Sequence, residues 1–124
     1  MSKQAAVGQF EQLILTAILS LRDDAYGVTI RDTVGALASP KSVSLGAVYA
    51  TLDRLEDKGL IESWLSEPTP ERGGRSKRHY RLRAAGERAL QESVETSRRV
   101  FEAVERRWGK WPGTGRRWKP AGQH

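Results

Sequence analysis

Residues 45–64 of this 124-residue chain read LGAVYATLDRLEDKGLIESW, and they hold the clearest helix signal in the sequence. Apolar residues recur every three or four positions, as one face of an α-helix requires, at Leu45, Val48, Leu52 and Leu55. Ser44 precedes the run as a good N-cap residue, and Gly59 supplies a C-terminal stop. The stretch therefore predicts a helix over 44–58 and then a strand over 60–65.

Two more helices are predicted upstream. Residues 9–22 place a wide apolar stripe on one helical face, formed by Phe10, Leu13, Ile14, Ala17, Ile18 and Leu21. Residues 25–38 give a second helical face, formed by Tyr26, Ile30, Val34 and Leu37. Gly27 and Gly35 weaken this second helix, and the break at 39–41 ends it.

Downstream, the sequence predicts a hairpin and then a long helix. Residues 66–77 hold two prolines and two glycines and indicate a loop, from which a strand returns over 78–82. Residues 84–111 predict one helix with a heptad seam of Leu90, Val94, Ser97, Phe101, Val104, Trp108 and Trp111. The last segment, 112–124, carries glycine, proline and basic residues without periodicity.

Three helices followed by a two-stranded hairpin form the winged helix-turn-helix plan. The fold class is therefore mainly α with a small two-stranded wing, extended by a long C-terminal helix. We expect a winged-helix DNA-binding domain over 9–83, a dimerisation helix over 84–111 and a flexible basic tail over 112–124.

Composition narrows the function classes. The net charge of +6 and the pI of about 10.1 suit a polyanionic partner, although many small soluble proteins are basic. The chain has no cysteine, which excludes disulfides, thiol nucleophiles and thiolate metal sites. No run approaches the ~18 apolar residues of a membrane helix, and the N-terminus lacks the apolar core of a signal peptide. We therefore expect a soluble cytoplasmic protein without a membrane partner.

Two stretches resemble the PadR family of bacterial transcriptional regulators: LGAVYATLDRLEDKGLIESW at 45–64 and GGRSKRHYRLRAAGERAL at 73–90. The resemblance covers residues 9–108, and the single C-terminal helix is similar to that of shorter members, which include multidrug-sensing repressors. It implies a homodimeric repressor that binds double-stranded DNA in the bacterial cytoplasm, associated with the nucleoid. One departure is Arg83, where the family usually has threonine; arginine cannot cap the last helix, so a shifted or less firm helix start is expected.

The helix 44–58 is the candidate recognition helix. The residues off its apolar stripe are Ser44, Ala47, Tyr49, Ala50, Thr51 and Arg54. The small ones allow close entry into a major groove, Tyr49 can donate to a phosphate, and Arg54 can reach a phosphate or a guanine edge. The alternatives are packing within the domain for Tyr49 and an ion pair with an acidic neighbour for Arg54. Lys41 and Ser42, in the preceding turn, are lesser candidates for backbone contacts.

The hairpin carries the second group of candidates. Residues 72–83 read RGGRSKRHYRLR, with five arginines and one lysine. A projecting hairpin lets such side chains reach phosphates or a minor groove and release condensed counterions. We expect these contacts from Arg72, Arg75, Lys77 and Arg78; the alternative is a solvated basic loop. Trp64 is interpreted as strand packing, and Tyr26 fits packing and a backbone contact equally well.

So small a body cannot bury the heptad seam of the last helix, and we expect that seam to pair with a second chain. The expected dimerisation residues are Leu90, Val94, Phe101, Val104 and Trp108. Packing against the first helix of the same chain is the alternative. The multidrug-sensing relatives also imply a small hydrophobic or aromatic effector near Phe10, Ile14, Phe101 and Trp108, unless the tryptophans are only dimer core.

Catalysis is the least favoured class. The sequence has no HExxH, no GxxxxGK[ST] and no paired-carboxylate motif. Its two histidines, His79 and His124, fall in a wing strand and at the terminus. We therefore expect no catalytic residue, no metal and no cofactor. Two alternatives to the repressor stay open: a winged helix that binds another protein, and a constitutive architectural DNA binder without ligand sensing.

Overall fold

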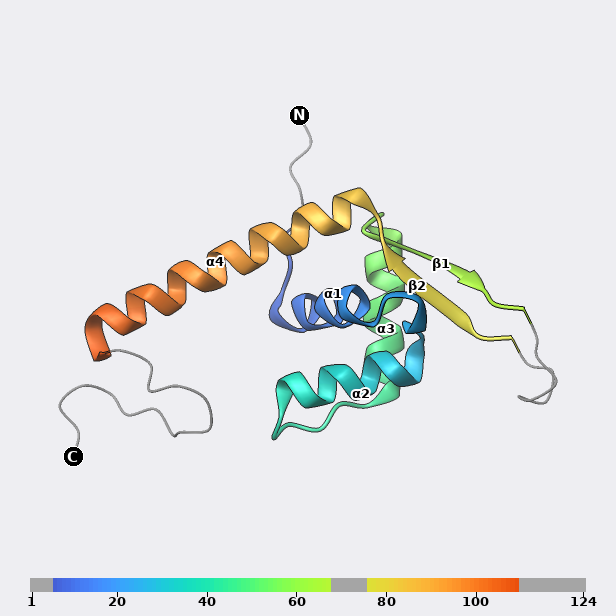
Figure 1. Cartoon of the computed structure of the whole chain (residues 1–124), viewed down its shortest axis with the longest axis horizontal. Coiled ribbons are helices and arrows are strands. Elements are labelled where there is room, and N and C mark those ends of the chain that lie inside the picture. The colour runs from blue at the N-terminus through green and yellow to red at the C-terminus, as the bar shows by residue number, and fades with distance from the viewer. Residues whose placement is uncertain (1–5, 68–75, 110–124) are drawn as a thin grey trace.

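A computed structural model describes residues 6–67 and 76–109 of the chain. The elements in chain order are α1 (Gln9–Leu21), the 3₁₀ helix η1 (Arg22–Asp24), α2 (Gly27–Ala38), α3 (Leu45–Asp57), β1 (Ile61–Leu65), β2 (Arg78–Leu82) and α4 (Ala84–Trp108). This is the predicted order of three helices, a hairpin and a long helix, so the fold class is confirmed. In Figure 1 the hairpin projects at one end of the helical body, while α4 extends beyond it at the other.

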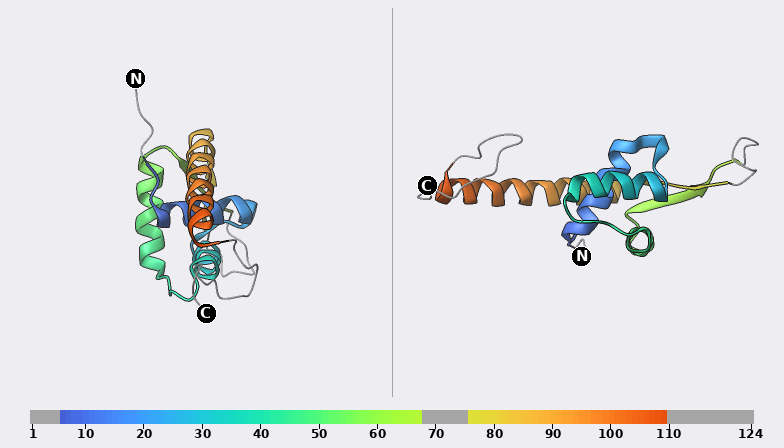
Figure 2. Two further views of the ribbon diagram at one scale, coloured as in Figure 1. Left: turned by 90° about the vertical axis from the view of Figure 1, so that its left-hand side faces the viewer. Right: turned by 90° about the horizontal axis from the view of Figure 1, so that it is seen from below.

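The three short helices and the base of the hairpin enclose one core. Ile14 and Leu15 of α1, Ile30 of α2, Leu52 of α3 and Ile61 of β1 are all 1% exposed or less. Each such side chain contributes ~1.5–3 kcal/mol when it leaves water. Figure 2 shows α3 standing at one side of this body, so its outer face is open to a partner.

Local signals fix both ends of α3. The Oγ atom of Ser44 accepts a hydrogen bond from the backbone nitrogen of Ala47 at 3.1 Å, which is a helix N-cap. Gly59 has φ of 78° and ends the helix in the left-handed region that glycine tolerates. Both predicted ends are therefore correct. Thr51 is a correction, because it is only 2% exposed and packs inward rather than off the apolar stripe.

The start of α2 differs from the prediction. Residues 25–26 are extended rather than helical: the backbone nitrogen of Tyr80 donates to the carbonyl oxygen of Ala25 at 2.9 Å, and Tyr26 forms an isolated bridge with His79. The helix therefore begins at Gly27, two residues later than predicted. Leu37, expected on the inner face, is 51% exposed.

The hairpin is antiparallel and has a simple register. It pairs Ile61 with Leu82 at its base and Leu65 with Arg78 toward its tip. The bridge at Tyr26 adds a third short stretch along the other edge of β2, so the wing is tied directly to the beginning of α2.

The helix α4 starts firmly at Ala84 even though the side chain of Arg83 makes no capping hydrogen bond. Two backbone contacts with Leu60 hold this end of the helix against the body instead. The nitrogen of Arg83 donates to the carbonyl oxygen of Leu60 at 2.9 Å, and Gly86 lies so close that a Cβ atom there would be 2.0 Å from the same oxygen. At its other end α4 stops at Trp108, and Trp111 of the predicted helix lies outside the described residues.

Candidate nucleic-acid interface

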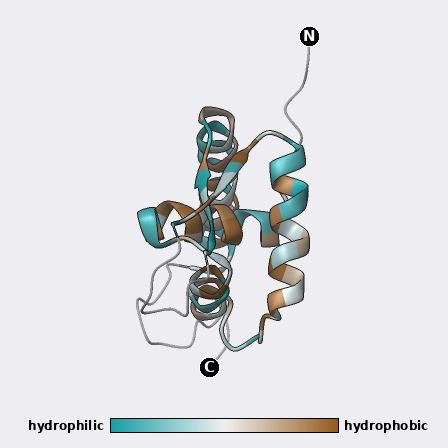
Figure 3. Cartoon of the chain, turned by 90° about the vertical axis from the view of Figure 1, so that its right-hand side faces the viewer, coloured by the Kyte–Doolittle hydropathy of each residue, from teal (hydrophilic) through white to brown (hydrophobic). Residues whose placement is uncertain are grey.

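The outer face of α3 is exposed and carries mostly small side chains at its N-terminal end. Ala47 and Ala50 are exposed, as is the N-cap Ser44, and Tyr49 is 42% exposed. Figure 3 shows hydrophobic and hydrophilic residues mixed along this helix, which lies at one side of the molecule. Small side chains at the N-terminal end allow the backbone to approach a groove closely, and the free N–H groups of that end favour a phosphate.

Tyr49 lies against the first residue of α2. A Cβ atom placed on Gly27 would be 2.1 Å from the phenolic oxygen of Tyr49 and 2.5 Å from its Cζ atom. Only glycine leaves room for the ring there. Packing within the domain and a contact with phosphate are thus both compatible with this position of Tyr49, since the ring rests on α2 while much of it stays exposed.

The other helix-side candidates are exposed. The Nη2 atom of Arg54 donates to the Oγ1 atom of Thr51 at 3.1 Å, which holds the guanidinium along the helix. Lys41 and Ser42 are exposed in the turn before α3. The backbone nitrogen of Lys41 donates a hydrogen bond to the carbonyl oxygen of Ala38 at 3.1 Å, and this bond holds the turn.

Toward the tip of the wing, just before β2, Lys77 meets the start of α2. Its Nζ atom lies 4.0 Å from the centre of the Tyr26 ring, a cation–π contact. Its backbone is fixed as well, because the nitrogen of Ser66 donates to the carbonyl oxygen of Lys77 at 2.8 Å. Lys77 and Tyr49 therefore flank the same two residues, Tyr26 and Gly27.

Arg78 is directed toward α3 through a short relay. Its Nη1 atom donates to the Oγ atom of Ser63 at 2.9 Å, and that hydroxyl donates to the Oε2 atom of Glu56 at 2.8 Å. Two residues further along β2, burial raises the pKa of Tyr80 to about 12, although the charge of Arg78 acts in the opposite direction. The start of β2 is thus joined both to α3 and to α2.

A row of stacked side chains on the outer face of the hairpin was not predicted as a unit. Trp64 stacks on His79 with ring centres 5.6 Å apart, and Tyr26 lies 5.5 Å from His79 on the other side. The guanidinium of Arg81 lies 5.2 Å from the Trp64 ring and pairs with Glu62. Strand packing is therefore the observed environment of Trp64. Alternation along the strands would have placed Trp64, His79 and Arg81 on one face, but not Tyr26.

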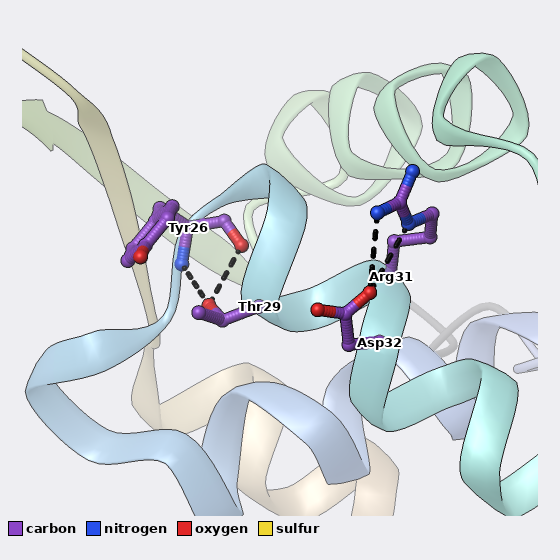
Figure 4. A network of polar contacts seen from close by, with 4 residues as sticks. All are labelled: Tyr26, Thr29, Arg31 and Asp32. Atoms are coloured by element: carbon purple, nitrogen blue, oxygen red, sulfur yellow. Dashed lines mark hydrogen bonds and ion pairs between the residues drawn. The ribbon is translucent and has the colours of Figure 1, made fainter.

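The N-cap of α2 anchors Tyr26 in this row. The backbone nitrogen of Tyr26 donates to the Oγ1 atom of Thr29 at 3.0 Å, and the Thr29 hydroxyl donates to the carbonyl oxygen of Tyr26 (Figure 4). In the same view Arg31 pairs with Asp32 at 3.2 Å and points from α2 toward α3. Arg31 is a basic residue near the candidate interface that the sequence reasoning missed.

The predicted dimerisation residues divide into two groups. Leu90 is 6% exposed and belongs to the core of its own chain, so its place in an exposed seam is a correction. Phe101 and Trp108 are 43% and 41% exposed on the part of α4 that extends from the body, Val94 is 40% exposed beside the body, and Val104 is half-buried. Hydrogen bonds from Gln12 of α1 reach Ser93 and Ser97, so packing on α1 accounts for the first half of α4.

The four candidate effector residues do not form one site within the chain. Ile14 is fully buried in the core, Phe10 packs beside that core, and Phe101 and Trp108 lie toward the far end of α4. Two grooves flank the first half of α4, and neither is lined by any of these four residues. The position of Ile14 therefore gives no support to its assignment.

Two predicted wing residues, Arg72 and Arg75, lie outside the described residues. Within 6–67 and 76–109, no three histidine, cysteine, aspartate or glutamate side chains come together as a metal site would require. No helix in these same ranges is both long and apolar enough to cross a membrane.

Comparison with known proteins gives the family. Residues 14–92 match the model of the transcriptional regulator PadR-like family. A PadR family transcription regulator from Clostridium difficile has a TM-score of 0.65 and 23% identity, over 80% of this chain and 97% of the other. A PadR-like transcriptional regulator from Bacillus cereus has a TM-score of 0.63 and 24% identity, over 77% and 86% of the two chains. No curated protein matches the chain significantly.

The two structural likenesses, below 25% identity, establish the winged-helix fold. The match to the family model spans more than half of the chain, from the core of α1 to the first turns of α4. Members of this family are generally non-enzymatic DNA-binding proteins and are typically dimeric. The chain therefore belongs to the PadR-like family of transcriptional regulators.

Proposed function

We propose that the protein is a homodimeric repressor that binds a pseudo-palindromic operator. It would act in the bacterial cytoplasm, associated with the nucleoid. The observation that carries this proposal is the meeting of α3, the wing and α2 at Tyr26 and Gly27. Tyr49 of α3 approaches Gly27 from one side, and Lys77 of the wing lies over Tyr26 from the other. One continuous surface thus presents a helix with small side chains beside a basic hairpin.

On DNA, α3 would enter the major groove, and the wing would follow the backbone or the minor groove. The small side chains of Ser44, Ala47 and Ala50 would let the backbone of α3 approach the groove closely. Tyr49 and Arg54 would reach phosphates or base edges. Lys77 and Arg78 would bind phosphates at the start of β2, together with Arg72 and Arg75 from the loop that precedes it. Few of these side chains suit bidentate base readout, so the shape of the DNA would contribute much of the specificity.

The exposed seam of α4 supports the dimer. Val94, Phe101 and Trp108 are large apolar side chains on a 25-residue helix that leaves the body of its own chain. A second copy of α4 would cover them, and a two-fold axis would place two recognition helices about one DNA turn apart, ~34 Å.

A small hydrophobic or aromatic effector would bind between the subunits and release the operator. Phe101 and Trp108 supply exposed rings on α4 for such a molecule. A groove of about 530 Å³ beside the first half of α4, lined in part by Leu19, Leu82 and Val94, offers a second apolar surface close to the body.

Sedimentation equilibrium of the wild type and of Phe101→Asp, each with and without duplex DNA, tests the dimeric repressor. We expect a wild-type dimer that binds one duplex with two chains, and a Phe101→Asp monomer with weakened binding. A wild-type monomer bound to DNA would contradict the dimer. A dimer that binds no DNA at moderate salt would indicate a protein-interaction module, and binding without sequence preference would indicate an architectural protein.

A further inference from the structure

The first turn of α1 touches both the long helix α4 and the C-terminal end of α3. On one side, the Oε1 atom of Gln12 accepts hydrogen bonds from the hydroxyls of Ser93 and Ser97 in α4. On another side, the Oε2 atom of Glu11 lies 2.9 Å from the Nζ atom of Lys58, the C-cap residue of α3. One helical turn therefore joins the helix proposed to dimerise to the helix proposed to read DNA.

The carboxylate of Glu11 has a fixed direction. Its side chain is 12% exposed, and its second oxygen accepts a hydrogen bond from the backbone nitrogen of Gly8 at 3.0 Å. Burial raises the pKa of Glu11, but the hydrogen bonds from Lys58 and Gly8 and the charges of Lys58 and Arg54 outweigh it and lower that pKa overall. The ion pair is therefore fully formed at neutral pH.

The ion pair lies at the end of α3 opposite its DNA-facing end, so a small tilt of the helix at the ion pair would displace the DNA-facing residues. The helix α3 has 13 residues, so it is ~20 Å long at ~1.5 Å per residue. Lys58 follows its C-terminal end, whereas Ser44, Ala47 and Tyr49 lie at its N-terminal end. A tilt of roughly 5° about one end would therefore move the other end by almost 2 Å. In a two-fold dimer the same displacement occurs in both subunits, so it changes the distance between the two DNA-facing ends.

We propose that Glu11 and Lys58 are positioning residues, whose ion pair fixes α3 against the unit of α1 and α4 and so restricts the half-site spacing that the dimer accepts. This inference rests on the proposed function, because spacing has meaning only for a dimer on a paired operator. Neither residue has to contact DNA for the pair to act in this way.

The test compares the half-site spacings that wild type and variants select from a pool of random duplex DNA. Glu11→Gln keeps a carbonyl oxygen for the Gly8 nitrogen and removes the ion pair. It also raises the net charge by one, so charge alone would tighten binding to every sequence. We expect Glu11→Gln to recover the wild-type half-site at several spacings, where the wild type recovers one. Lys58→Met should do the same, and Lys58→Arg should keep the single spacing.

Asp32→Asn is the matched control. It also converts a paired carboxylate to an amide, but Asp32 pairs with Arg31 of the same helix at 3.2 Å and so joins no two elements. Thermal denaturation of every variant confirms that the selected protein is folded. If folded Glu11→Gln and Lys58→Met keep the wild-type spacing, the positioning role is wrong. If the wild type itself selects no paired half-sites, the proposed function fails instead.

Discussion

Replacing Gly27 with alanine should separate DNA affinity from fold stability. The new Cβ atom would lie 2.1 Å from the phenolic oxygen of Tyr49 and 2.5 Å from its Cζ atom. An ordinary contact between heavy atoms is ~3.5 Å, so the end of the Tyr49 side chain must move by more than ~1 Å. Because that ring is exposed on one side, it can swing outward without disturbing the core.

The expected change in stability is small. Alanine is favoured over glycine within a helix by ~1 kcal/mol, and somewhat less at the first helical position, Gly27. This gain offsets the lost contact of the Tyr49 ring, so the free energy of unfolding should change by less than ~1 kcal/mol. DNA binding should suffer more. If the Tyr49 hydroxyl donates to a phosphate, its displacement removes a hydrogen bond to a charged group, worth ~1.5–3 kcal/mol, which is about 10- to 150-fold in affinity.

Fluorescence anisotropy with an operator duplex and urea denaturation measure the two effects. Gly35→Ala is the control, because it lies in the same helix and its added Cβ atom would meet nothing within 4 Å. That variant should gain stability and keep its affinity. In a Tyr49→Ala background, Gly27→Ala should cause no further loss of affinity. Wild-type affinity in Gly27→Ala, or a loss of several kcal/mol in stability, would refute this account of Tyr49.

Three further predictions concern other contacts. Gly86→Ala should lower the free energy of unfolding by about 1–3 kcal/mol or more in urea denaturation, since its Cβ atom would be 2.0 Å from the backbone oxygen of Leu60; a neutral change would contradict that packing. Arg78→Ala should weaken binding to all sequences alike and reduce the slope of log affinity against log salt by about one unit, and an unchanged slope would restrict Arg78 to its relay with Ser63. Because the pKa of Glu11 is lower in the folded protein than its usual 4.5, its contribution to stability is complete above pH 4.5 and is lost as the pH falls through the lower value. Denaturation between neutral and acid pH should therefore show a smaller acid loss for Glu11→Gln than for the wild type, and equal losses would show that the ion pair does not stabilise the fold.

Capping and turn residues in the sequence predicted the helix ends that depend on contacts between neighbouring residues. The helix α3 was placed correctly at both ends because Ser44 and Gly59 act within one turn of it. The start of α2 was missed because residues 25–26 pair with β2, more than fifty positions away. No helical periodicity carries that information. The same contact explains why the tilted ring contact of Tyr26 with His79 could not be predicted.

The sequence named candidate residues for the site but did not indicate the contacts between them. The basic strand at Lys77 and Arg78 and the small face of α3 could be seen in the sequence. The contact of Tyr49 with Gly27 could not, because a helical glycine gives no sign of what approaches it. A heptad pattern also cannot distinguish a chain's own core from a partner's, and for this reason Leu90 was assigned to the seam although it is buried within its own chain.

Selection of bound DNA from random genomic fragments tests the central claim most directly. The purified protein is incubated with the fragments, and affinities for the recovered sites are then compared at two salt concentrations. The account predicts an inverted repeat with half-sites about one turn apart, bound more weakly at the higher salt. Recovery of fragments that share no sequence, or of none at moderate salt, would contradict a dimeric operator-binding repressor.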